Sequence, residues 1–329
     1  MLREPELMKA VVYEEYGPPD VLHLTELPKP TPTDDQLLIR IRAVSINGSD
    51  REGLIGQPAY ARMAGLRKPR HPILGSDIAG VVEAVGRNIT EFQPCDHVFG
   101  ELAGYRGGFA EYVCTHGQTL LRMPPTLTFE QAAAIPQGGV IALNGIVTKG
   151  RVRPGQRVLI NGAGGSAGVF AIQLARLQGA EVTGVDNAHK QELMRSLGAD
   201  HVLDYRREDF TAGGQQYDLI LDLIAHRPVF DCARALRRNG TYYVVGGYTR
   251  VLLQVLLLGP WIGWTKQRRM RVLVVPQNRR DLAAITELCE QGDVVPIIDR
   301  RYPLREAAAA MRYVSEGRAQ GKVVVTMEE

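Results

Sequence analysis

This chain has few cysteines, a small net charge and no long apolar run. Its 329 residues include four cysteines, and no two of them are closely spaced. Isolated cysteines behave mostly as small core residues, and a chain with few of them suits a reducing compartment. We therefore expect a cytoplasmic protein. The cysteines are Cys95, Cys114, Cys232 and Cys289.

No apolar run is long enough to span a bilayer. The longest covers residues 251–258 and ends at Gly259-Pro260, whereas a spanning helix needs about 20 apolar residues. The first residues, Met1 to Glu6, lack the apolar core of a secretion signal. We expect no membrane partner, and we interpret the 251–258 run as a helix that lines a cleft or a protein interface.

The charge balance gives no support for a nucleic-acid partner. The formal net charge is +3, and no DNA- or RNA-binding motif accompanies it. We interpret two basic clusters, Arg67-Lys68-Arg70 and Lys266-Arg268-Arg269-Arg271, as solvated faces or loop edges. Hydrophobic residues make up 45% and charged residues 23%. This balance supports a sizeable core in a chain long enough for two domains.

The pattern of apolar residues changes near Phe129. Residues 8–125 hold many short alternating runs between Gly and Pro turns, which predicts a β-rich, barrel-like domain. From Phe129 onward helices alternate with strands, as in a parallel sheet with crossover helices. A last strand at 322–325 is expected to return to the first domain. Strands of the parallel sheet are predicted at 157–160, 181–185, 201–203, 217–221, 241–245 and 271–275.

A glycine-rich turn joins the first of these strands to a helix. The segment from Asn161 to Gly168 reads NGAGGSAG and opens a helical pattern at 169–175. Glycines let the backbone approach phosphates closely, and the free N–H groups and dipole of the helix face the negative charge. The sequence therefore predicts a dinucleotide pyrophosphate site. Its expected contacts are Gly162, Gly164, Gly165, Ser166 and Ala167.

An acidic residue stands where a dinucleotide site needs one. Asp186 follows the strand at 181–185, close to the ~20-residue spacing expected after such a turn. Its carboxylate can accept hydrogen bonds from the adenosine ribose and would repel a 2′-phosphate. This favours NADH over NADPH. The alternative is a glycine-rich turn followed by a surface aspartate.

Four further segments carry a family signature: residues 75–86 (GSDIAGVVEAVG), 108–113 (GFAEYV), 154–160 (PGQRVLI) and 197–205 (LGADHVLDY). Through them the chain from Met8 onward resembles the medium-chain dehydrogenase/reductase superfamily, and within it the zinc-free quinone oxidoreductase branch. The resemblance implies an α/β protein with its active site between two domains. These are a GroES-like β-rich catalytic domain (1–125 and 277–329) and a Rossmann, doubly wound parallel-sheet NAD(P)-binding domain (126–276).

The positions that hold catalytic zinc in metal-dependent members of the superfamily match Asn47, Ser76-Asp77 and residues 137–139 here. These residues lack the three nitrogen, sulfur or carboxylate ligands that zinc needs, and Cys95 and Cys114 stand alone. We predict no metal. Without zinc to stabilise an alkoxide, the favoured substrate is a hydrophobic small molecule that delocalises charge, such as a quinone or an α,β-unsaturated carbonyl compound.

The resemblance also assigns roles to three polar residues of the first domain. It places Asn47 beside the nicotinamide ribose or the substrate, gives Asp50 an orienting role, and places Tyr60 in the substrate pocket as a donor of a hydrogen bond or a proton. Each has a plainer alternative: a loop cap for Asn47, a helix cap for Asp50 and a surface aromatic for Tyr60. No general acid is identified, and solvent is an alternative proton source.

The remaining cofactor contacts follow from the same resemblance. His189 takes the place of a basic residue found in NADPH-dependent relatives, while Lys190, Tyr205 and Arg206 keep NADPH open as an alternative. Lys322 matches a basic residue that reaches the pyrophosphate, and its alternative is a solvated lysine at a strand edge. The residues expected to flank adenosine and nicotinamide at strand ends are Leu223, Ile224, Gly246 and Gly247.

One position departs from the family pattern. Ile141 stands where relatives commonly carry a threonine, which removes one hydrogen bond to the cofactor or substrate. By analogy with relatives, a homodimer is expected through the edge strand at 271–275, although Arg269 and Arg271 can blunt that edge.

The leading hypothesis is a zinc-independent, NAD(P)H-dependent oxidoreductase that transfers hydride to a quinone or an enone. One alternative is a zinc-free alcohol or carbonyl dehydrogenase. The other is a weakly catalytic NAD(P)-binding sensor or scaffold.

Overall fold

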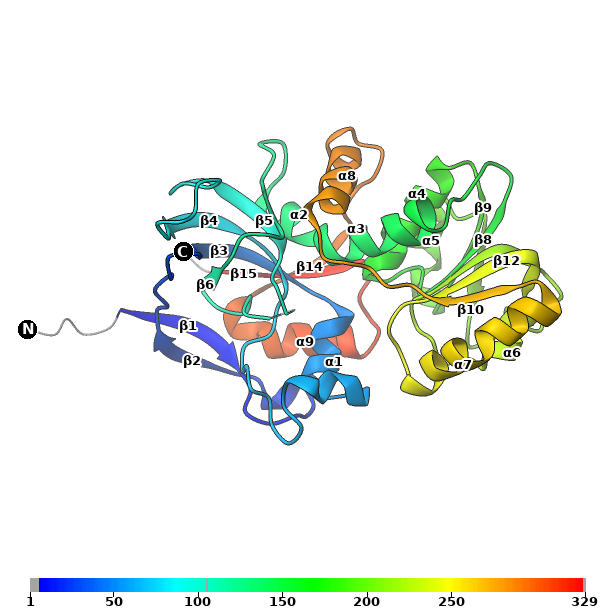
Figure 1. The fold of residues 1–329 in the computed structure, drawn as a ribbon, viewed down its shortest axis with the longest axis horizontal. Coiled ribbons are helices and arrows are strands. Elements are labelled where there is room, and N and C mark those ends of the chain that lie inside the picture. The colour runs from blue at the N-terminus through cyan, green and yellow to red at the C-terminus, as the bar shows by residue number, and fades with distance from the viewer. Residues whose placement is uncertain (1–5, 105, 328–329) are drawn as a thin grey trace, which may run out of the picture. The chain divides into compact units, whose positions relative to one another are not determined.

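The computed structural model describes residues 6–104 and 106–327 of the chain (Figure 1). The packing of the backbone separates two compact units. Unit 1 comprises residues 1–137, 277–290 and 296–329, and unit 2 comprises residues 138–276 and 291–295. Each unit has its own hydrophobic core.

Unit 1 is built on a seven-stranded sheet with the order β14-β15-β3-β4-β5-β7, in which β6 also pairs with β3. The long strand β3 (Leu37–Ile46) is rich in β-branched residues, and its Ile39 and Ile41 are fully buried. It pairs antiparallel with β15 (Lys322–Thr326), so the last strand returns to the first domain as predicted. β1 and β2 form a separate two-stranded sheet.

The other strands of unit 1 are β1 (Leu7–Val12), β2 (His23–Pro28), β4 (Asp77–Val85), β5 (His97–Glu101), β6 (Tyr112–Thr115), β7 (Leu120–Arg122) and β14 (Ile298–Pro303). Its helices are α1 (Gly48–Ile55), α2 (Phe129–Ala134), α8 (Arg279–Glu290) and α9 (Ala307–Ser315).

Unit 2 is a parallel six-stranded sheet with the order β10-β9-β8-β11-β12-β13. The chain starts in the centre with β8, builds outward to β10, then crosses back to β11 and continues to the other edge. This is the doubly wound Rossmann order, and its switch point lies between β8 and β11. The strands are β8 (Arg157–Asn161), β9 (Glu181–Asp186), β10 (His201–Asp204), β11 (Tyr217–Asp222), β12 (Leu236–Val244) and β13 (Arg269–Val272).

Helices pack against this sheet, as expected for crossover connections. In the sequence the strand β8 is a continuous apolar run, and in the structure Val158, Leu159 and Ile160 are all fully buried. The helices α4 and α5 contact strands β8, β9 and β10, while α6 and α7 contact β12 and β13. The helices are α4 (Ser166–Leu177), α5 (Gln191–Ser196), α6 (Val229–Arg234) and α7 (Thr249–Lys266); α3 (Pro136–Leu143) begins at the boundary between the units.

The division between the units differs from the predicted boundaries at two places. The first segment of unit 1 runs to Gln137 rather than to residue 125, because α2 packs on β3 and β4. Residues 291–295 belong to unit 2, although the sequence places everything after 276 in the catalytic domain. Among the residues that the structure describes, none of the helices is long and apolar enough to cross a bilayer.

Candidate active site

The glycine turn in unit 2 has the backbone shape that a phosphate site requires. After β8, Gly162 adopts a positive φ of 89° and donates its N–H to the Val185 carbonyl oxygen (2.9 Å). Gly165 precedes the first residue of α4, Ser166, and the first N–H groups of a helix have no carbonyl partner within that helix. A Cβ at Gly168 would overlap the backbone oxygens of Gly162 and Ala163, so only glycine allows the helix to pack this closely on the turn.

Asp186 ties the glycine turn to the neighbouring strand. It is the last residue of β9, where the sequence predicts it. One carboxylate oxygen accepts the Gly164 N–H (3.0 Å) and the other accepts the Asn187 N–H (2.9 Å). The Lys190 Nζ lies 3.3 Å from the second oxygen, and both side chains are nearly buried. The alternative of a surface aspartate is therefore wrong.

Other predicted cofactor residues of unit 2 gather at the same edge of its sheet. The Tyr205 N–H donates to the Asp186 carbonyl oxygen (3.1 Å), and the Leu223 N–H donates to the Asn161 carbonyl oxygen (3.0 Å). A Cβ at Gly162 would meet the Ile224 side chain at 3.0 Å. His189 is exposed in the turn after β9. Gly246 and Gly247 follow β12 with φ values of 59° and 85°.

The sequence did not predict a buried carboxylate at the switch point, which hydrogen-bonds the ends of the neighbouring strands to one another. Asp222, at the end of β11, accepts hydrogen bonds from the Asn161 amide (2.8 Å) and the Tyr242 hydroxyl (2.8 Å). It also accepts the backbone N–H groups of Ile224 (3.0 Å) and Ala225 (2.8 Å). The signal that could have revealed it is an aspartate directly after an apolar strand, the same signal that identifies Asp186.

In unit 1, Asn47 and Asp50 close the first turn of α1. Asn47 is the N-cap residue, and its N–H donates to the Asp50 carboxylate (2.7 Å). The second oxygen of Asp50 accepts the Gly75 N–H (2.9 Å). Burial raises the pKa of Asp50 to about 7, against the lowering effect of these two hydrogen bonds. Both residues therefore have the capping geometry, and their catalytic roles remain predictions.

Lys322 is the buried cation of this cluster. Its Nζ donates to the Asn47 Oδ1 (2.7 Å) and lies 3.3 Å from the Asp77 carboxylate. The side chains of Lys322 and Asp77 are both 0% exposed. The alternative of a solvated lysine at a strand edge is wrong, because β15 is an interior strand of the sheet. The predicted pyrophosphate contact stays a prediction.

A third carboxylate, that of Glu101, extends the cluster. Gln137 donates its side-chain amide to Glu101 (2.7 Å) and its backbone N–H to Asp77 (3.0 Å). Burial, and next the charge of Asp77, raise the pKa of Glu101 to about 8. Three acidic groups, Asp50, Asp77 and Glu101, thus belong to one network with a single ammonium.

Tyr60 lies apart from this network in a 3-10 turn. Its half-buried hydroxyl donates to the Glu52 carboxylate (3.1 Å). Burial, and next the charge of Glu52, raise the pKa of Tyr60 well above its ordinary value. Its role in substrate binding remains a prediction.

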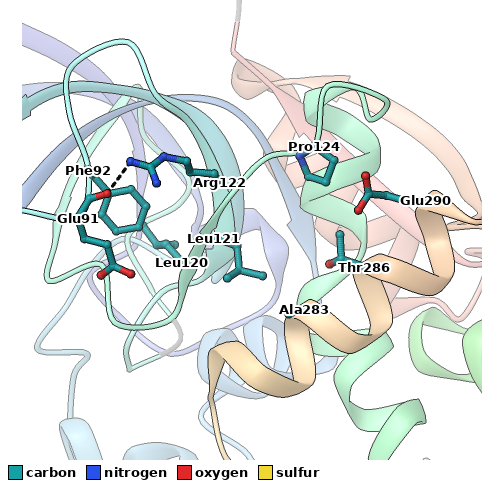
Figure 2. A pocket seen from close by; sticks show the side chains of 9 residues that line it. All are labelled: Glu91, Phe92, Leu120, Leu121, Arg122, Pro124, Ala283, Thr286 and Glu290. Carbon is teal, nitrogen blue, oxygen red and sulfur yellow. Dashed lines mark hydrogen bonds between the residues drawn. The ribbon is translucent and has the colours of Figure 1, made fainter.

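A cavity of about 360 Å³ in unit 1 is separate from all of these residues (Figure 2). It lies beside β7 and α8, and Arg122 on its wall donates to the Glu91 carbonyl oxygen (2.6 Å). None of the predicted site residues line it. Its lining residues are Glu91, Phe92, Leu120, Leu121, Arg122, Pro124, Ala283, Thr286 and Glu290.

Comparisons with known proteins agree with this architecture. Residues 33–125 match the alcohol dehydrogenase GroES-like domain, and residues 197–325 match a zinc-binding dehydrogenase domain. The quinone oxidoreductase of Pongo abelii is 30% identical over 98% of both chains. The chain belongs to the quinone oxidoreductase family of medium-chain dehydrogenases/reductases. The solved quinone oxidoreductase of Coxiella burnetii is 28% identical, with a TM-score of 0.88 over 98% of this chain and 100% of that one.

Another relative is named for a different activity. The 2-methylene-furan-3-one reductase of Solanum lycopersicum is 29% identical over 98% of this chain and 79% of its own. The quinone oxidoreductase family thus has relatives named for two kinds of conjugated acceptor.

Within this family, the residues of the chain do not fit a catalytic zinc ion. The matched positions carry the Asn47 amide, the Ser76 hydroxyl, Asp77 and Gln137, and the one carboxylate among them is paired with the Lys322 ammonium. Throughout the described ranges, no group of three or more His, Cys, Asp or Glu side chains is arranged to hold a metal. The dinucleotide fit is better, because the turn carries glycine at positions 162, 164 and 165, and the close packing at Gly168 sets the first turn of α4 directly on it.

Proposed function

We propose that the protein is a zinc-independent oxidoreductase that uses NADH or NADPH to reduce quinones or α,β-unsaturated carbonyl compounds. One observation carries the proposal. The chain has a complete dinucleotide turn from Gly162 to Gly168, while the positions matched to zinc ligands carry amides, a hydroxyl and a lysine-paired carboxylate. The names of its relatives, quinone oxidoreductase and 2-methylene-furan-3-one reductase, support the same class of acceptor.

The choice of acceptor follows from charge. A reduced dinucleotide whose pyrophosphate is held by the glycine turn would supply a hydride, and the acceptor would then carry negative charge on oxygen. A simple ketone needs a strong electrophile to stabilise an alkoxide, whereas a quinone or enone spreads the charge over its conjugated system. The residues of this chain therefore have to orient the acceptor, exclude water and donate hydrogen bonds. Asn47, Asp50 and Tyr60 are the proposed groups.

We further propose that NADH is preferred over NADPH. The Asp186 carboxylate stands at the end of β9, where the adenosine ribose binds in this fold. A 2′-phosphate there would meet this negative charge. Lys190 offsets part of the repulsion, but its Nζ is already within 3.3 Å of the Asp186 carboxylate.

A cytoplasmic location and a homodimer also remain proposals. The sheet order leaves β13 with one unpaired edge. Pairing this edge with a second copy would bring the exposed Arg269 and Arg271 of both copies together. Light scattering of the purified protein would measure the oligomeric state directly.

Steady-state assays test the proposed activity. We expect oxidation of NADH, and slower oxidation of NADPH, in the presence of quinones or enones and without added metal. If cofactor binds but no acceptor is reduced, the protein is a nucleotide-binding sensor, a second candidate that Ile141 favours because it removes a hydroxyl near the nicotinamide. Reduction of NAD by short or long alcohols would instead indicate an alcohol dehydrogenase.

A further inference from the structure

The helix α7 of unit 2 is apolar on both faces, but only one face is covered. Val251, Val255 and Ile262 are buried on the side that packs against β13 and α6. On the other side Leu257 is 74% exposed and Trp264 is 84% exposed. A helix that is apolar all round is normally buried on every side.

The exposed residues form one continuous stripe. Leu253, Leu257, Trp261 and Trp264 follow each other at steps of four, four and three residues, which places them on one face of a helix. Leu256 is 60% exposed beside them. Contiguous apolar surface of this kind marks an interaction site more often than scattered single residues do.

The charges of α7 itself all have one sign. Between Cys232 and Pro276 the sequence has no aspartate or glutamate, although the whole chain has 36 acidic residues. Arg250 lies at the start of α7 and Lys266 at its end, and both are exposed. Within the described part of the chain, no salt bridge joins either of them to a carboxylate, and Asp231 of the neighbouring α6 is paired with Arg234 (2.6 Å).

Aromatic residues adjoin the basic end of the stripe. Phe230 of α6 packs edge-on against Trp261, with ring centroids 6.1 Å apart. The Lys266 Nζ lies 5.5 Å from the centroid of the Phe230 ring. Tryptophan rings next to basic side chains are typical of surfaces that lie at the boundary between lipid headgroups and acyl chains.

We propose that α7 binds the surface of an anionic lipid bilayer. The stripe of Leu253, Leu257, Trp261 and Trp264 enters the headgroup–acyl boundary, and Arg250 and Lys266 contact anionic headgroups. The helix lies in the plane of the membrane, which requires an apolar face flanked by basic residues and no spanning segment. The expectation of no membrane partner rests on the lack of a spanning segment, and surface binding does not need one.

Charge complementarity favours a bilayer over a second copy of the chain. A symmetric dimer would pair the stripe with itself. Arg250 and Lys266 of both copies would then meet, and residues 232–276 supply no acid to neutralise them. An anionic membrane supplies the opposite charge over the whole patch.

The chain provides its own reporter for this surface. Its only two tryptophans are Trp261 and Trp264. Full-length protein is mixed with vesicles made of equal parts phosphatidylcholine and phosphatidylglycerol, or of phosphatidylcholine alone. We expect cosedimentation with the anionic vesicles, a blue shift of tryptophan emission, and reversal of both by high salt. No cosedimentation, or cosedimentation without an emission shift, would overturn the proposal.

Matched variants separate this patch from general electrostatics. The R250E/K266E double variant should bind the anionic vesicles at least about tenfold more weakly. The R67E/K68E variant changes the net charge equally at exposed residues of unit 1 and should bind as the wild type does. An equal loss in both would show that the patch has no special role.

An apolar pair completes the test. The L257S/W264S variant should lose vesicle binding, while L177S, at a residue 45% exposed on α4, should keep it. If instead L257S/W264S converts a dimer to a monomer in the absence of vesicles, the stripe is an interface between two copies and the membrane proposal is wrong. Circular dichroism and thermal melts would verify that every variant is folded.

Discussion

The Nζ of Lys322 lies 2.7 Å from the Oδ1 of Asn47, although the two residues are 275 positions apart in the sequence. The contact joins the last strand of unit 1 to the N-cap of its first helix. The same ammonium lies 3.3 Å from Asp77, and the pair is fully buried. The Lys322 ammonium thus neutralises Asp77, the one acidic side chain at the positions that match metal ligands in other members of the superfamily.

Replacing Lys322 should destabilise unit 1 strongly. Lys322→Met leaves the Asp77 carboxylate buried without a counter-charge, a change that typically costs about 3–5 kcal/mol. Urea unfolding would measure the loss. Lys322→Met combined with Asp77→Asn should recover much of it, because no charge then remains unpaired. A Lys322→Met variant within about 1 kcal/mol of the wild type would contradict this assignment.

The acidic cluster should make stability fall as pH rises. The folded-state pKa values of Asp50, about 7, and Glu101, about 8, lie above their ordinary values, so their contribution is fully present at low pH and is lost as pH rises through these values. Glu101→Gln should reduce the loss between about pH 5 and about pH 9 by on the order of 2 kcal/mol. Denaturant melts at a series of pH values would measure the free energy of unfolding of both proteins. If its slope against pH is the same in Glu101→Gln and the wild type, other groups cause the pH dependence.

The glycine turn should tolerate a methyl group at one position and not at another. Gly168→Ala drives its Cβ into backbone oxygens that cannot move independently, so we expect a loss of about 2–4 kcal/mol and no cofactor binding. Gly165→Ala meets nothing nearer than the Gly162 oxygen at 3.3 Å and serves as the matched control for stability, since Gly165 is itself an expected pyrophosphate contact. Thermal melts would compare the two variants, and NADH titration would check the loss of binding in Gly168→Ala. Equal behaviour would show that the packing of α4 on the turn is looser than described.

The hydrogen bond from the Tyr242 hydroxyl to the buried Asp222 carboxylate should contribute to the stability of unit 2. Tyr242→Phe keeps the ring in the core but removes one donor from a fully buried carboxylate, at an expected cost of about 1–3 kcal/mol. Tyr243→Phe is a useful control, because that hydroxyl donates to a backbone carbonyl oxygen of Lys149 (3.1 Å) and not to a charge. Chemical denaturation would rank the two variants. A smaller loss for Tyr242→Phe than for Tyr243→Phe would argue against this role.

Removing Asp186 should shift cofactor choice. Asp186→Ser eliminates the negative charge near the ribose and releases Lys190 from its ion pair, so the ratio of NADPH to NADH affinity should rise about tenfold, which corresponds to about 1.4 kcal/mol. Adding Lys190→Met should abolish this rise in relative NADPH affinity. Fluorescence titration with NADH and with NADPH would measure both affinities. If Asp186→Ser weakens both cofactors equally, the residue only supports the Gly164 N–H.

Local patterns predict the parallel sheet better than they predict the polar clusters. Apolar runs place β8 and β9 within one residue, and Asp186 ends its strand as expected. β12 begins at Leu236 rather than 241, because the polar residues up to Gly240 conceal a strand held by backbone hydrogen bonds. β13 covers 269–272 rather than 271–275 for the same reason, since it begins with an exposed arginine.

The buried network around Lys322 has no local signal at all. Asn47, Asp77 and Lys322 come from three distant segments, and no spacing in the sequence relates them. Each residue alone also fits a cap, a loop or a solvated edge. Only the pairing of β15 with β3 makes them neighbours.

That pairing has a consequence for the order in which the protein matures during translation. Unit 2 is complete once residue 295 has left the ribosome, whereas unit 1 still lacks β14 and β15 at that moment. Until Lys322 emerges, β3 has an open edge and Asp77 has no cation beside it. The unit whose synthesis begins first is therefore the last to close.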